Sequence, residues 1–100
     1  MFGSVFHMTP RPGHEQQLQA QFERWNKERA PKVKGYVETL GLRKVDGSGQ
    51  LIGVAVFASR EDYERNAQDP EQDAWYRELR SHLTEDPMWE DGEVVYRATA

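Results

Sequence analysis

The sequence predicts an α+β fold in which a four-stranded antiparallel sheet carries its helices on one face. Four short segments have the alternating or continuous apolar character of strands, and longer regions repeat apolar residues every three to four positions. These segments follow one another as strand, helix, strand, strand, helix, strand. A chain of 100 residues and 11.6 kDa supplies one modest core, so we expect a single domain over residues 1–100.

The first part of the chain predicts a strand followed by a helix of about four turns. Phe2–Met8 alternates as a strand does, and Thr9–Gly13 ends it with two prolines and a glycine. From His14 the period changes to that of a helix, which should end near Ala30 because Pro31 cannot continue the backbone hydrogen bonds. The apolar face of this helix contains Leu18, Phe22 and Trp25.

The middle of the chain predicts a β-hairpin. Tyr36–Val45 and Leu51–Ala58 have strand character, and they flank the glycine-containing turn Asp46–Gln50. The second of these strands is apolar on both sides, as in a strand that is buried on both faces. Its two faces are Ile52, Val54 and Val56 on one side, and Leu51, Ala55 and Phe57 on the other.

Two helix starts and a final strand are predicted after the hairpin. Ser59 caps a short helix that runs to about Asn66, and Asp69 caps a longer helix with Pro70 at its first position. Glu85–Pro87 should end the longer helix, Asp91-Gly92 reads as a turn, and residues 93–97 read as the last strand. The apolar stripe of the longer helix is Trp75, Leu79, His82 and Leu83.

This order of elements predicts the ferredoxin-like βαββαβ arrangement, because two right-handed strand-helix-strand crossovers joined by a hairpin place both helices on one face. The other face of the sheet then has no cover, although the third strand is apolar there. An open apolar face favours aggregation in a monomer. We therefore expect a homodimer in which two copies pack sheet on sheet into a barrel.

Composition excludes several classes of function. The chain has no cysteine, which rules out disulfides, thiolate nucleophiles and cysteine metal sites. A net charge of −4 argues against nucleic acid as a partner. There is no apolar stretch of membrane-spanning length and no leader-like start, so we expect a cytoplasmic protein without a membrane partner. No metal-ligand spacing occurs, and we expect no metal site.

Three short motifs join the predicted elements. Pro12-Gly13 precedes the first helix, and Gly35-Tyr36 opens the second strand. The run Val56-Phe57-Ala58-Ser59-Arg60-Glu61-Asp62-Tyr63 leads from the third strand into the next helix. Together with the first helix and the hairpin, these motifs resemble the antibiotic biosynthesis monooxygenase (ABM) domain of the dimeric α/β barrel superfamily, and the similarity spans most of the chain.

The resemblance implies a cofactor-independent monooxygenase that acts on a small aromatic phenol or quinol in a cavity between sheet and helices. A base would remove the phenolic proton, and the electron-rich anion would pass an electron to O2 inside a dry aromatic cavity. The superfamily also contains haem-degrading enzymes, which need an Asn, a Trp and a His. The first two of these positions hold Phe6 and Asn66 here, and only His82 lies near the third, which argues against haem degradation.

The candidate site residues are two histidines and a set of apolar and aromatic side chains. His82 and His7 are the candidate bases, although a helix C-terminus alone would explain His82, and His7 could point to either face of the sheet. His14 reads as a solvated residue at a helix start. The candidate cavity lining is Phe6, Tyr36, Trp75, Tyr76 and Leu79, of which Trp75 fits a core position best.

A second class of function stays open from the sequence. The chain shows no acid, base and orienting partner at a clear spacing. That absence favours a non-catalytic dimer of the same fold that binds a small ligand or another protein. Oxygen uptake that depends on substrate separates an oxygenase from such a binding dimer.

Overall fold

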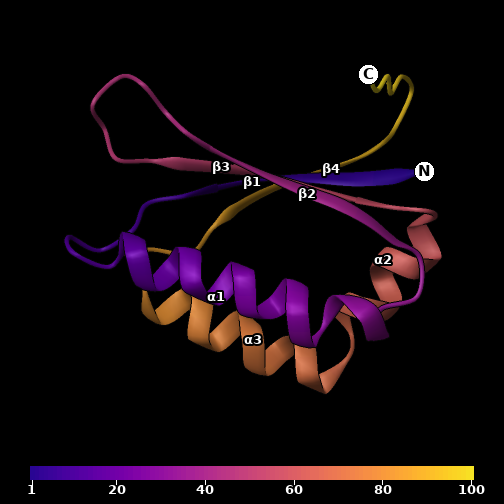
Figure 1. Ribbon diagram of the computed structural model, residues 1–100, viewed down its shortest axis with the longest axis horizontal. Helices are drawn as coiled ribbons and strands as arrows, with labels where there is room; N and C mark the ends of the chain where they lie inside the picture. Colours follow the sequence, from indigo (N-terminus) through magenta and orange to yellow (C-terminus); the bar gives the residue numbers. More distant parts are fainter.

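The computed structural model describes all 100 residues and contains one four-stranded sheet of order β2-β3-β1-β4. Strand β1 (Phe2–Met8) pairs antiparallel with β3 (Leu51–Phe57) and with β4 (Met88–Glu93), and β2 (Tyr36–Arg43) pairs antiparallel with β3. The helices are α1 (Glu15–Glu28), α2 (Arg60–Ala67) and α3 (Pro70–Ser81), with a short 3-10 turn over Ala30–Lys32. All of them lie on one side of the sheet (Figure 1), which confirms the predicted fold class.

The alternation in β1 divides the two faces of the sheet. Its even-numbered residues from Phe2 to Met8 are buried on the helix side, and the odd-numbered residues between them are only partly covered. The core lies between β1 and the helix pair, and its members are Phe6, Met8, Leu18, Leu79 and Leu83. Burial of such side chains is the main stabilising contribution, at about 1.5–3 kcal/mol for each large residue.

The helix starts follow from capping residues that the sequence shows directly. The Ser59 hydroxyl accepts a hydrogen bond from the Asp62 backbone N–H at 3.1 Å, and the Asp69 carboxylate accepts one from the Glu71 backbone N–H at 2.9 Å. Pro70 occupies the first position of α3, where its missing N–H costs nothing. These contacts confirm both predicted starts.

The predictions for the end of α3 and for the last strand were wrong. The helix ends at Ser81, because the backbone N–H of His82 turns back to the Leu79 carbonyl and the chain then crosses to pair with the segment after β1. Strand β4 begins at Met88, well before the predicted residue 93, and it contains Asp91 and Gly92. Gly92 has no positive φ, since it lies extended opposite Gly3 of β1.

The sheet face opposite the helices carries no cover within the chain. The strand register places Ile52, Val54 and Val56 on this face, beside Val5 and His7 of β1. Large apolar side chains around them are exposed: Leu40 at 59%, Leu42 at 57% and Met88 at 65%. The prediction that β3 is apolar on both faces is confirmed. None of the helices has the length and apolar content needed to cross a membrane.

Candidate functional site

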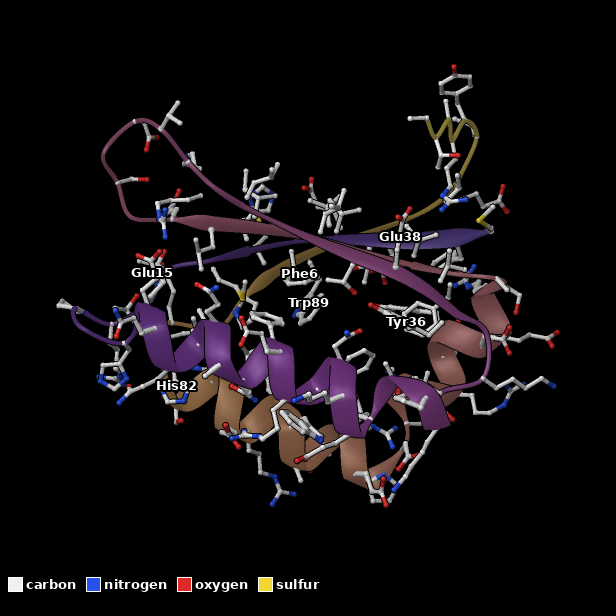
Figure 2. All side chains as sticks on the ribbon, in the orientation of Figure 1. Phe6, Glu15, Tyr36, Glu38, His82 and Trp89 are labelled. Atoms are coloured by element: carbon white, nitrogen blue, oxygen red, sulfur yellow. The ribbon has the colours of Figure 1, made fainter.

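An aromatic pair on the helix-side face joins the central strand β1 to the edge strand β4. The rings of Phe6 and Trp89 lie with their centroids 5.0 Å apart, and Phe22 of α1 continues the contact behind Phe6. Phe6 is 5% exposed, whereas Trp89 is 44% exposed although it is on the same face. Figure 2 shows both labelled residues between the sheet and α1. The helix-side face is therefore open along the edge strand β4.

Gly53 fixes the position of the Phe6 ring. Phe6 and Gly53 are register partners in β1 and β3, and the ring lies directly over the glycine. A Cβ atom on Gly53 would lie 2.1 Å from a ring carbon of Phe6, closer than any real contact. The missing side chain in β3 thus makes room for the ring on which Trp89 rests.

A polar cluster lies beside the aromatic pair on the same face. The Ser4 hydroxyl donates a hydrogen bond to Asp91 Oδ1 at 2.6 Å, and the Tyr63 hydroxyl donates to the same oxygen at 3.1 Å. Ser4 is buried, and the three residues come from β1, β4 and α2. Burial raises the pKa of the Tyr63 hydroxyl, and the nearby Asp91 charge raises it further. Tyr63 is therefore a phenol that donates at neutral pH.

The aromatic residues farther along the helix side pack against one another. The ring of Tyr36 lies 5.0 Å from that of Trp25 and 5.8 Å from that of Phe57, and Phe57 contacts Tyr63. The Tyr36 hydroxyl donates to Thr39 Oγ1 at 2.9 Å within its own strand. In Figure 2 this residue lies toward α2, apart from Phe6 and Trp89.

The three candidate lining residues of α3 have different surroundings. Leu79 belongs to the core beside Phe6, and Tyr76 packs against that core. The Arg24 guanidinium instead lies over the Trp75 ring, 4.8 Å from the centroid of that ring. Trp75 also lines a surface hollow of about 250 Å³. The structure therefore brings Leu79 and Tyr76 toward the aromatic pair and places Trp75 at the outside of the helix layer.

Neither candidate base lies beside the aromatic pair. His7 is on the sheet face without helices, where its Nε2 lies 3.1 Å from Glu90 Oε2. His82 caps the end of α3, and its Nδ1 lies 3.1 Å from Nδ1 of His14 at the start of α1. Figure 2 shows His82 at the end of the helix pair, away from Phe6 and Trp89. No group of three or more His, Asp and Glu side chains is arranged to hold a metal ion.

Sequence reasoning did not include Trp89, Asp91 or Ser4 among the site residues, because Asp91-Gly92 had been interpreted as a turn. A signal for them was present in the sequence. Trp89 and Asp91 have the two-residue spacing of side chains on one strand face, and Phe6 and Ser4 have the same spacing in the first strand.

Comparisons with known proteins identify the fold. No protein-family model matches this chain, and no curated protein matches it in sequence. A solved structure of a mutant of SnoaB, a cofactor-independent oxygenase from Streptomyces nogalater, has a TM-score of 0.81 at 19% identity over 96% of this chain and 94% of its own. A proposed antibiotic biosynthesis monooxygenase from Caulobacter crescentus CB15 has a TM-score of 0.82 at 14% identity over 95% and 90%.

A protein of unknown function from Nitrosomonas europaea is similar as well, with a TM-score of 0.78 at 15% identity over 99% of this chain and 93% of its own. The fold and these matches define a ferredoxin-like α+β domain. More narrowly, the chain has the fold of the antibiotic biosynthesis monooxygenases among these structures, so the fold implied by the resemblance of its motifs is confirmed. At sequence identities of 14–19%, the similarity establishes the fold only. The activities named for these structures belong to those proteins.

Proposed function

We propose that this protein is a cofactor-independent monooxygenase that acts on a small phenol or quinol between the sheet and the helices. The observation that carries the proposal is the half-exposed Trp89 ring, which packs at a tilt of 39° against the buried Phe6 ring at the open edge of the helix-side face. An aromatic substrate can stack on such a ring while its reactive part lies against apolar side chains. The shared fold with SnoaB, described as a cofactor-independent oxygenase, supports the same class of reaction.

The reaction balances without an external reductant. For 1-naphthol, one oxygen atom of O2 becomes the new ring carbonyl of 1,4-naphthoquinone, and the other leaves as water. The ring supplies all four electrons, and the O–H and the opposite C–H of the ring supply the two hydrogens of the water. The protein therefore needs only to bind the phenol, accept its proton and keep water from the radical pair.

Oxygen consumption with 1-naphthol tests the proposed activity. We expect uptake of one O2 for each 1,4-naphthoquinone formed, with one labelled atom in the quinone when 18O2 is used. Removing the stacking ring in Trp89→Ala should lower kcat/KM by at least tenfold. Tyr96→Ala removes an aromatic side chain that is 83% exposed in the C-terminal segment, and it should change kcat/KM by less than twofold. Binding of 1-naphthol without oxygen uptake would contradict the proposal and support the non-catalytic dimer.

Variants can identify the residue that acts as the base in the proposed reaction. The histidines predicted from the sequence, His7 and His82, remain candidates. A His7→Ala or His82→Ala variant that loses oxygen uptake but still binds 1-naphthol would identify the base. Retained uptake in both variants would exclude them.

A homodimer through the sheet face without helices is part of the same proposal. Apolar residues from all four strands are uncovered there, and such a face is a hazard in a monomer. Two polar side-chain contacts accompany the apolar residues, His7 with Glu90 at 3.1 Å and Glu38 with Arg97 at 2.9 Å. The C-terminal segment rises on this side of the sheet (Figure 1) and helps to line a groove of about 410 Å³. A second copy packed sheet on sheet would cover this surface.

Leu40→Lys is expected to weaken the proposed dimer about 100-fold. Each copy loses about 1.5 kcal/mol of apolar burial, the change occurs twice in a symmetric interface, and about 1.4 kcal/mol corresponds to a tenfold change. Light scattering after gel filtration should give twice 11.6 kDa for the parent and a lower mass for the variant at the same concentration. Val45→Lys makes the same change at a fully exposed hairpin position and should stay dimeric. A parent of 11.6 kDa at all concentrations would refute the dimer.

A further inference from the structure

We infer that Trp89 and Asp91 form one binding site for a hydroxyl-bearing aromatic molecule, with the ring on Trp89 and the hydroxyl on Asp91 Oδ2. This inference rests on the proposed function and names the group that holds the substrate. Trp89 is opposite Phe6, and Asp91 is opposite Ser4, so the aromatic pair and the polar pair are neighbours on one face of β1 and β4. Two residues along a strand span about 7 Å, which is about the length of a two-ring aromatic molecule.

The hydrogen bonds of the polar cluster leave one acceptor free. Ser4 and Tyr63 both donate to Oδ1 of Asp91, and Oδ2 has no hydrogen-bond or ion-pair partner within the chain. Each of the two hydroxyl groups has one proton, and it is already donated to Oδ1, so neither can donate to a ligand. No cation pairs with Asp91, and the residue is exposed along the open edge of the sheet. The cluster therefore offers acceptor atoms, and it selects a ligand that donates.

Ser4 and Tyr63 are positioning residues in this arrangement. They come from β1 and α2, so they hold the Asp91 carboxylate to two elements other than its own strand. Ser4 is 1% exposed and makes the shorter hydrogen bond, at 2.6 Å. A carboxylate held at Oδ1 keeps a fixed place for Oδ2 beside the Trp89 ring, and this lowers the entropy cost of orienting the ligand hydroxyl.

The same carboxylate can accept the substrate proton during the proposed reaction. A phenol becomes a strong acid once its ring loses an electron, so a carboxylate is a sufficient acceptor for its proton. In this step the O–H bond breaks, the proton goes to Asp91 Oδ2, and the electron goes from the ring to O2. The products are a phenoxyl radical, superoxide and protonated Asp91, and they balance the phenol, O2 and carboxylate that enter the step.

Anaerobic binding of a matched probe series tests the site without any turnover. The probes are 1-naphthol, 1-methoxynaphthalene, which has no donor, 1-naphthoate, which carries a negative charge, and 1-naphthylmethylammonium. We expect 1-naphthol to bind at least tenfold more tightly than the ether or the carboxylate. In a protein NMR titration it should shift the indole N–H signal of Trp89, assigned with Trp89→Phe, more than that of Trp25.

Asp91→Asn is the decisive variant, because an amide keeps the acceptor for Ser4 and Tyr63 but replaces Oδ2 with a donor. The dissociation constant for 1-naphthol should rise at least tenfold, and that for 1-methoxynaphthalene should not change. Glu85→Gln makes the same kind of change at an exposed position between α3 and β4, and it should leave both constants unchanged.

Three results would overturn the inference: equal affinity of the parent and Asp91→Asn for 1-naphthol, equal affinity of the parent for the naphthol and its ether, or tighter binding of the ammonium probe. The probe series needs only the parent protein, so the inference remains testable if Asp91→Asn does not fold. Because binding is measured without O2, loss of the site and loss of the proposed oxygenase activity give different results.

Discussion

Gly35→Ala is expected to destabilise the fold by about 2–5 kcal/mol, a large fraction of the roughly 5–15 kcal/mol by which a small domain is stable. Gly35 has φ of +81°, where an alanine costs about 1–2 kcal/mol. A Cβ atom there would also lie 2.1 Å from Asp62 Oδ2. Asp62 has little freedom to move, since Arg65 donates a hydrogen bond to it at 2.6 Å. The resulting overlap adds about 1–3 kcal/mol. Urea unfolding should show the lower midpoint.

Gly47→Ala separates the two causes, because Gly47 also has φ of +81° but nothing lies within 4 Å of its Cβ position. The Gly47→Ala variant should therefore be destabilised only by the cost of placing alanine at a positive φ, about 1–2 kcal/mol. Asp62→Ala in the Gly35→Ala background should restore part of the difference. Equal losses in the Gly35 and Gly47 variants would show that the contact with Asp62 does not matter.

Arg29→Met is expected to lower the free energy of unfolding by about 3 kcal/mol, because it leaves several partners of a buried charge without that charge. Arg29 follows α1 and is 5% exposed. Its guanidinium donates to Glu71 Oε2 at 2.8 Å and to Asn66 Oδ1 at 2.9 Å, and it lies 3.2 Å from Asp69 Oδ2. These contacts join the end of α1 to the connection between α2 and α3. Thermal and urea unfolding should both report the loss.

Arg77→Met provides the comparison for this prediction. Arg77 pairs with Asp73 on the exposed side of α3, and its side chain is 78% exposed. An exposed pair four residues apart on a helix contributes about 0.3–0.5 kcal/mol, so this variant should be close to the parent. If the two arginine variants unfold at the same urea concentration, the Arg29 cluster does not stabilise the fold.

Most of the fold could be predicted because its signals are local. Ser59 and Asp69 mark the starts of their helices through capping hydrogen bonds to residues within three positions. The alternation that identifies the first strand lies within the seven residues Phe2–Met8. The position of β4 could not be predicted from local signals. Asp91-Gly92 has the composition of a turn, but pairing with β1 holds it extended. Tertiary pairing outweighs local propensity at such a strand.

The candidate site was harder to predict, because its contacts are distant in sequence. Ser4 and Asp91 are 87 residues apart, and His14 and His82 are 68 apart. No periodicity within one element shows that these side chains meet. Tyr36, Tyr76 and Leu79 were placed on the helix side by pattern alone, whereas the outward position of Trp75 depends on how α3 packs against α1.

The central position of β1 also determines how the chain can fold. This strand is synthesised well before both of its neighbours, since Phe2 pairs with Phe57 on one side and with Glu93 on the other. Closing such long loops lowers the chain entropy before the stabilising contacts between the strands form. We therefore expect slow folding for a domain of this size. The sheet cannot be completed until β4 has been synthesised. A chain that stops before Met88 therefore leaves one side of β1 unpaired.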